Sequence, residues 1–164
     1  MAINSKIEWC DSTWNPWIGC HKVSPGCKNC YMFRDMGRRG WNPNVVVRSK
    51  TTFDAPIKWA KSGKLSAGNK IFTCSLSDFF IEDADEWRND AWDVIQKTPH
   101  LTYQILTKRP ENIKDRLPAN WGDGWDNVWL GVSAENQAMA DKRIPILLSI
   151  PAKIRFVSAE PLLG

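Results

Sequence analysis

Short apolar runs alternate with segments of helical character between residues 70 and 160, and this rhythm limits the folds open to the chain. The runs are rich in Val, Ile, Phe and Tyr, which is typical of strands. Strands are expected at residues 70–75, 101–106, 128–132 and 154–157, after a first strand near residues 12–19. Alternating strands and helices form parallel βαβ units with right-handed crossovers. We therefore expect an α/β chain folded as a partial (incomplete) parallel β/α barrel of about five strands.

Helix signals follow these strands at three places. Helices are expected from Asp83, which can act as the cap, to the stop at Pro99; from Pro110 to about Leu117; and from Glu135 to about Arg143, with a second short turn from Pro145.

A single domain of residues 1–164 is expected, divided into a metal-binding loop (12–31), an inserted basic segment (32–69) and repeating β/α units (70–164). The inserted segment should hold a short helix, an extended run at residues 45–47 and a helix capped by Asp54. A sheet of about five strands leaves an open edge. We expect either a truncated form or a protein partner or second copy that covers this edge, because bare edge strands invite pairing.

Three cysteines, Cys20, Cys27 and Cys30, lie within eleven residues, and Pro25 and Gly26 favour a turn between them. Clustered thiolates suit zinc or an iron–sulfur cluster. Three ligands leave one position open, as reactive metal sites do. The spacing favours an iron–sulfur cluster, and a Cys3His zinc site that includes His21 is the alternative. The other two cysteines, Cys10 and Cys74, stand alone and are expected to be small buried apolar residues.

The composition fits a protein that works in the cytoplasm. The longest apolar runs are too short to span a bilayer, and residues 1–11 lack the apolar core of a signal peptide. We expect no membrane partner. An odd number of unevenly spaced cysteines favours metal binding in a reducing compartment over disulfides.

Positive charge is concentrated at the N-terminal end of the chain. Residues 1–60 contain nine Lys or Arg against four Asp or Glu, whereas the rest of the chain is close to balanced. Basic residues surround one tryptophan and predict a nucleic-acid surface made of Arg34, Arg38, Arg39, Trp41, Arg48 and Lys50. The alternative is an ordinary solvated face.

Polar residues follow each expected strand, and in parallel α/β folds such residues meet at one rim. The candidate cofactor-binding residues at this rim are Ser75, Ser77, Asp78, Lys108, Ser133, Glu135 and Glu160.

Six stretches together carry a resemblance to a known family: residues 13–20, 23–31, 75–80, 106–112, 127–136 and 156–163. They resemble a phage- and prophage-associated three-cysteine family. That family is similar to the radical S-adenosylmethionine superfamily, with spore photoproduct lyase among its more similar members. A phage-encoded protein of this kind would work in the host cytoplasm. The gaps of six and then two residues between the cysteines differ from the superfamily's common gaps of three and then two.

The resemblance implies a [4Fe-4S] cluster held by Cys20, Cys27 and Cys30, with S-adenosylmethionine on the fourth iron. It implies that Ser75, Ser77 and Asp78 lie near the amino end of that cofactor. Lys108, Ser133 and Glu135 become candidates for its carboxylate and ribose.

Two classes of function follow. The first is a radical S-adenosylmethionine-type enzyme acting on nucleic acid. The second is a non-catalytic zinc or iron–sulfur module, or a truncated barrel, that docks nucleic acid or a phage or host protein.

Overall fold

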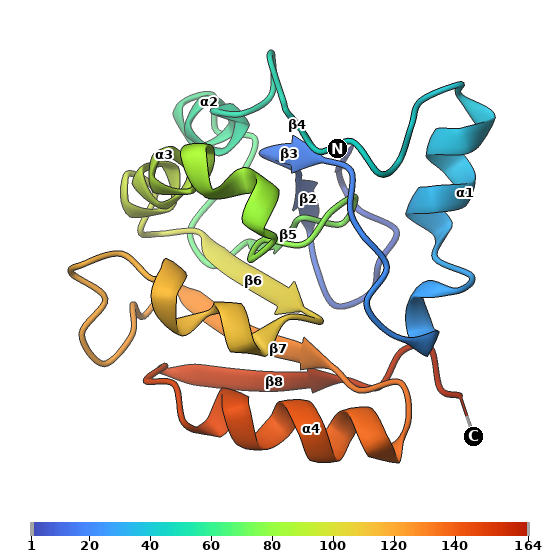
Figure 1. Ribbon diagram of the computed structural model, residues 1–164. Coiled ribbons are helices and arrows are strands. Elements are labelled where there is room, and N and C mark those ends of the chain that lie inside the picture. The colour runs from blue at the N-terminus through green and yellow to red at the C-terminus, as the bar shows by residue number, and fades with distance from the viewer. Residues whose placement is uncertain (1, 164) are drawn as a thin grey trace.

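The computed structural model describes residues 2–163 and contains a mixed α/β fold built on a five-stranded parallel sheet (Figure 1). The parallel strands are β2 (Ser12–Trp14), β5 (Lys70–Thr73), β6 (Thr102–Thr107), β7 (Val128–Ser133) and β8 (Ile154–Ser158). Their order in the sheet follows their order in the chain, and β1 (Ala2–Ile3) adds an antiparallel strand beside β2. The α/β prediction and the positions of four strands are confirmed.

β5, β6 and β7 are buried along most of their length, as are the strands of a parallel sheet that is covered on both faces. α3 (Asp85–Gln96) and α4 (Gln137–Leu148) are the two longest helices described, and α4 packs on β7 and β8. Ile71, Ile105 and Leu130 from three neighbouring strands are fully buried in the core. Trp92 of α3 lies in an aromatic cluster, with its ring centroid 4.8 Å from that of Phe79. Burial of these rings and aliphatic chains is the main force that holds the domain together.

The expected first strand is divided. Only Ser12–Trp14 joins the main sheet, while β3 (Trp17–Ile18) pairs with β4 (Val47–Arg48) in a separate two-stranded sheet. The expected strand over residues 12–19 was therefore too long, because Asn15 and Pro16 interrupt it. The inserted segment also contains α1 (Tyr31–Arg38) and α2 (Ala55–Lys61), and Asp54 takes the cap position of α2 without a side-chain capping bond.

Three helix boundaries differ from expectation. α3 begins at Asp85 after a 3-10 turn (η2, Glu82–Ala84), and Asp83 pairs with His21 in place of capping the helix. The segment after Pro110 forms two 3-10 turns, η3 (Pro110–Asn112) and η4 (Lys114–Arg116).

α4 runs without interruption through Pro145, although a stop before this residue was expected. Asn136 caps the start of the helix by accepting from the Met139 N–H at 3.0 Å. Packing of α4 on the sheet outweighs the one backbone hydrogen bond that the proline removes.

β8 forms the outer edge of the sheet and pairs only with β7 within residues 2–163. Ile154 and Val157 on this strand are exposed. No helix in the described part of the chain is long and apolar enough to cross a membrane.

Candidate functional site

A cavity of about 830 Å³ lies at the carboxyl ends of the parallel strands. In Figure 1 the strand arrowheads of β6, β7 and β8 point toward the side of the molecule where residues 20–30 and α1 lie. The polar part of the lining comes from strand ends and the cysteine loop: Cys20, Cys27, Asn29, Cys30, Tyr31, Cys74, Ser75, Ser77, Asp78, Thr107, Lys108, Arg109, Ser133, Ser158 and Glu160. Apolar side chains, among them Trp9, Phe72 and Leu106, line the remainder.

All three clustered cysteines line this cavity. The 3-10 turn η1 (Pro25–Cys27) presents Cys27 to it, and Cys30 immediately precedes α1. Burial, together with the charge of Asp78, raises the pKa of the Cys20 thiol to about 11, and Arg109 acts in the opposite direction. A metal ion would displace this proton, since only the thiolate is a ligand.

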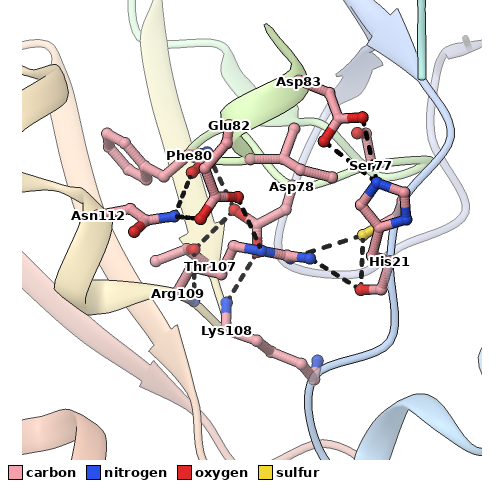
Figure 2. Close-up of polar contacts among 12 residues, drawn as sticks. His21, Ser77, Asp78, Phe80, Glu82, Asp83, Thr107, Lys108, Arg109 and Asn112 are labelled. Atoms are coloured by element: carbon pink, nitrogen blue, oxygen red, sulfur yellow. Dashed lines mark hydrogen bonds and ion pairs between the residues drawn. The ribbon is translucent and has the colours of Figure 1, made fainter. Parts of the chain in front are cut away.

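Arg109 is a buried cation in contact with the first of these cysteines (Figure 2). Its Nη1 lies 3.7 Å from the Cys20 Sγ and 3.4 Å from Asp78 Oδ2, and its Nη2 donates to the His21 carbonyl at 2.9 Å. Asp78 is itself fixed, because it accepts from the Thr107 hydroxyl at 2.7 Å and from the Lys108 N–H at 3.0 Å. The guanidinium therefore has a fixed orientation, with one N–H toward sulfur.

The His21 imidazole is paired with a carboxylate. Its Nε2 lies 3.1 Å from both carboxylate oxygens of Asp83 (Figure 2). Both side chains are partly exposed. This pair occupies Nε2 alone, and a histidine that binds metal through one ring nitrogen commonly bonds a carboxylate through the other, so the Cys3His zinc alternative stays open. His21 is not among the residues that line the cavity.

Glu135 anchors the cysteine loop through hydrogen bonds from Ser24 and Gly26. Its side chain is completely buried, and Oε2 accepts from Arg143 Nη1 at 2.6 Å. Oε1 accepts from the Gly26 N–H at 3.2 Å and from the Ser24 hydroxyl. Burial raises the pKa of this carboxyl, but the hydrogen bond from Ser24 and the Arg143 charge outweigh it, and the net pKa lies below its ordinary value.

The other predicted cofactor-binding residues fall into two groups. Ser75, Ser77, Asp78, Lys108, Ser133 and Glu160 line the cavity, whereas Glu135 does not. Within the first group Lys108 Nζ donates to the Ser133 hydroxyl at 3.0 Å, and Ser77 donates to the Gly19 carbonyl at 2.5 Å. Six of the seven predicted residues therefore meet at one cavity, as expected. Both carboxylate oxygens of Asp78 and of Glu135 already accept hydrogen bonds from the protein.

Two cavity residues were missing from the predicted site. Arg109 follows the expected strand over residues 101–106, but the sequence gives no sign of its contact with Cys20, because 89 residues separate them. Cys74 is buried as expected, yet it also lines the cavity as a fourth thiol. Burial and the nearby Asp78 and Cys20 raise its pKa well above the ordinary value. Its place near the end of the expected strand over residues 70–75 was the only sequence signal.

The predicted nucleic-acid residues separate into two sets. Arg34, Arg38, Arg39 and Trp41 lie exposed on α1 and just after it. Arg48 and Lys50 line a second cavity of about 820 Å³ together with Phe53, Lys58 and Trp87. Arg48 stacks 4.1 Å from the Phe53 ring centroid and pairs with Asp90 at 2.9 Å. Both side chains of this ion pair remain partly open to solvent.

The donor set suits a thiolate-bound metal group, and the room suits a small cofactor. Three thiols converge on one cavity, and a volume of about 830 Å³ lies within the usual range for cofactor sites. Among residues 2–163, no three Cys, His, Asp or Glu side chains are already arranged as a metal-binding group.

A family model described as "Protein of unknown function (DUF5131)" matches residues 4–164, nearly the whole chain. The chain belongs to the DUF5131 family. No curated protein and no solved structure matches it. The family assignment therefore covers the cysteine loop and every strand end of the cavity, and carries no activity of its own.

Proposed function

We propose that this chain binds a [4Fe-4S] cluster through Cys20, Cys27 and Cys30 and acts as a radical S-adenosylmethionine-type enzyme. The observation that carries the proposal is that three cysteines line one cavity at the carboxyl ends of parallel strands. His21 does not line the cavity, which supports a fourth metal position that is open to an outside ligand. Such a cluster supplies the electron that cleaves the sulfonium of S-adenosylmethionine.

The chain's own groups can bind and orient the cofactor and exclude water. Lys108 is a cation within the cavity, suited to a carboxylate, and the Ser75 and Ser158 hydroxyls lie on the same lining. Trp9 and Phe72, with ring centroids 4.7 Å apart, form an apolar wall suited to a planar base. Arg109 directs an N–H at the Cys20 sulfur, which stabilises a thiolate.

The same proposal includes the barrel. A sheet whose parallel strands follow the order of the chain is the arrangement of a β/α barrel, and the exposed edge of β8 is where further strands, a partner or a second copy would pair. Five cysteines without a disulfide fit a reducing cytoplasm.

A second candidate is a non-catalytic site closed by a fourth thiolate. Cys74 lines the cavity, and it lies near enough to Cys20 that a Cys20 thiolate would raise the pKa of the Cys74 thiol. Four thiolates would hold zinc or a cluster with no open position.

The test is product formation after anaerobic reconstitution with iron and sulfide. With S-adenosylmethionine and dithionite, the wild-type chain should form 5′-deoxyadenosine, and Cys27→Ala should form none. Cys10→Ser is the matched control, because Cys10 is a buried thiol outside the cavity lining, and it should retain the product. A fully loaded wild-type protein that forms no 5′-deoxyadenosine would refute the enzyme proposal.

A further inference from the structure

The net positive charge of the chain comes from one short segment. Residues 20–41 carry five Lys or Arg against one Asp, a balance of +4, which equals the balance of the whole chain. The remaining residues carry 17 charges of each sign. The segment therefore has a local field that the rest of the molecule does not cancel.

This segment also forms one wall of the cavity. Cys27, Cys30 and Phe33 belong to the lining. Lys22 lies against the same wall, with its Nζ 5.0 Å from the Phe33 ring centroid and 3.4 Å from the Lys28 carbonyl. Lys28 is also close to the cavity, because its chain neighbours Cys27 and Asn29 both line it.

The basic charge continues along α1 away from the cavity. Met32 and Met36 are buried, while Arg34 and Arg38 on the same helix are exposed. Arg34 pairs with Asp35 at 2.8 Å, and both side chains remain open to solvent. A surface pair of this kind is weak and can exchange for a phosphate.

An exposed aromatic ring lies beyond the end of α1. Trp41 is 52% exposed, and its backbone N–H donates to the Met36 carbonyl at 3.1 Å, which turns the chain back toward the helix. The chain has ten tryptophans, and within residues 2–163 Trp41 is the one whose side chain is largely exposed. A solvent-facing indole beside guanidinium groups provides a stacking platform.

We propose that this basic strip (Lys22, Lys28, Arg34, Arg38, Arg39 and Trp41) binds a single strand of nucleic acid whose phosphates follow α1 and one base of which stacks on Trp41. The strip leads to the cavity mouth, so the strand is the substrate of the proposed enzyme. That substrate role rests on the proposed function, whereas the binding does not.

The structure favours a single strand over other polyanions. Guanidinium groups match phosphate geometry, and a base must be unpaired to stack on an indole or reach a cavity. A membrane surface fits poorly, because the apolar face of α1 is already occupied by buried Met32 and Met36 and the helix has only eight residues. Arg48 and Lys50 are not counted in the strip, because they lie outside residues 20–41 and line the second cavity.

Fluorescence anisotropy of a labelled oligo-dT with the full 164-residue chain tests the proposal, with and without the cluster. Two triple charge reversals are compared, one in the strip and one among exposed lysines elsewhere: R34E/R38E/R39E and K61E/K64E/K97E. The strip variant should weaken binding at least tenfold. It should also make the plot of log K against log salt concentration less steep by about 2, because each of three lost phosphate contacts on a single strand changes that slope by about 0.7. The control should stay within twofold of wild type. Circular dichroism confirms that each variant is folded.

Trp41→Ala separates base stacking from charge. It should weaken oligo-dT binding about tenfold and leave heparin binding unchanged, because each stacked base contributes roughly 1–3 kcal/mol. Equal losses of oligo-dT affinity in the two triple variants would overturn the proposal. It would also be overturned if the chain bound a duplex, anionic vesicles or polyglutamate more tightly than oligo-dT. If the chain binds the strand but forms no 5′-deoxyadenosine, only the enzyme proposal is refuted. If it forms 5′-deoxyadenosine but does not bind the strand, only the binding proposal is refuted.

Discussion

Removing the Glu135 carboxylate should destabilise the fold and loosen the cysteine loop at the same time. The Glu135 and Arg143 side chains are 0% and 3% exposed, and their nearest atoms are 2.6 Å apart. Glu135→Ala leaves the guanidinium buried without its partner. Breaking a buried pair in this way costs about 3–5 kcal/mol. That is a large share of the roughly 5–15 kcal/mol that stabilises a domain.

The local effect should be confined to the turn that presents Cys27. Glu135 Oε1 accepts from the Ser24 hydroxyl and the Gly26 N–H, so the variant leaves both donors without their acceptor. Hydrogen exchange at the Gly26 and Cys27 amides should accelerate. Ser24→Ala removes only one of these bonds and should cost about 1 kcal/mol.

The assay is chemical unfolding of wild type, Glu135→Ala and Glu135→Gln, with exposed Glu111→Ala as a control expected within about 0.5 kcal/mol of wild type. Because the pKa of Glu135 is lowered in the folded state, its carboxylate contributes stability above the unfolded pKa. The difference between wild type and Glu135→Gln should therefore shrink as the pH falls below about 4.3. A loss below about 1 kcal/mol in Glu135→Ala, with unchanged exchange at Gly26, would refute this reasoning.

Three further predictions concern the loop, the cluster and the core. Gly26→Ala places a methyl 2.9 Å from the Glu135 Cδ, so chemical unfolding should show a loss of about 1–3 kcal/mol, and wild-type stability would contradict the contact. Arg109→Gln removes the charge beside Cys20 and should lower the midpoint potential of the reconstituted cluster by an amount on the order of 59 mV, a tenfold change in a one-electron equilibrium, while Arg109→Lys should lower it less. Redox titration measures this shift, and identical potentials in all three proteins would count against the role of Arg109. Trp92→Ala should cost about 3–5 kcal/mol because the ring is 2% exposed within the aromatic cluster, and a loss under 1 kcal/mol would show that the cluster is loosely packed.

The parallel sheet was predictable because β5, β6 and β7 are largely apolar and are buried along most of their length. Ile71, Ile105 and Leu130 mark three of these strands in the sequence and lie fully buried in the structure. The length of α4 was not predictable, because its passage through Pro145 depends on packing against the sheet, which local propensity does not report.

The cavity lining was predictable because parallel strands end on the same side of a sheet. The sequence could not show which polar residues are free to meet a ligand. Glu135 interacts with Ser24 across 111 residues, and Arg109 meets Cys20 across 89. Such long-range contacts depend on the assembled fold, so one predicted ligand-binding residue is a buried anchor and one unpredicted arginine lies beside a cysteine.

The most direct measurement of the central claim is the metal and sulfide content of anaerobically reconstituted protein, with its visible spectrum. We predict a brown protein with about four irons and four sulfides per chain. Both should be lost in Cys27→Ala and retained in Cys74→Ser, which keeps the cavity but removes its fourth thiol. A colourless protein with one equivalent of zinc, or equal loss in the two variants, would contradict a cluster held by three cysteines.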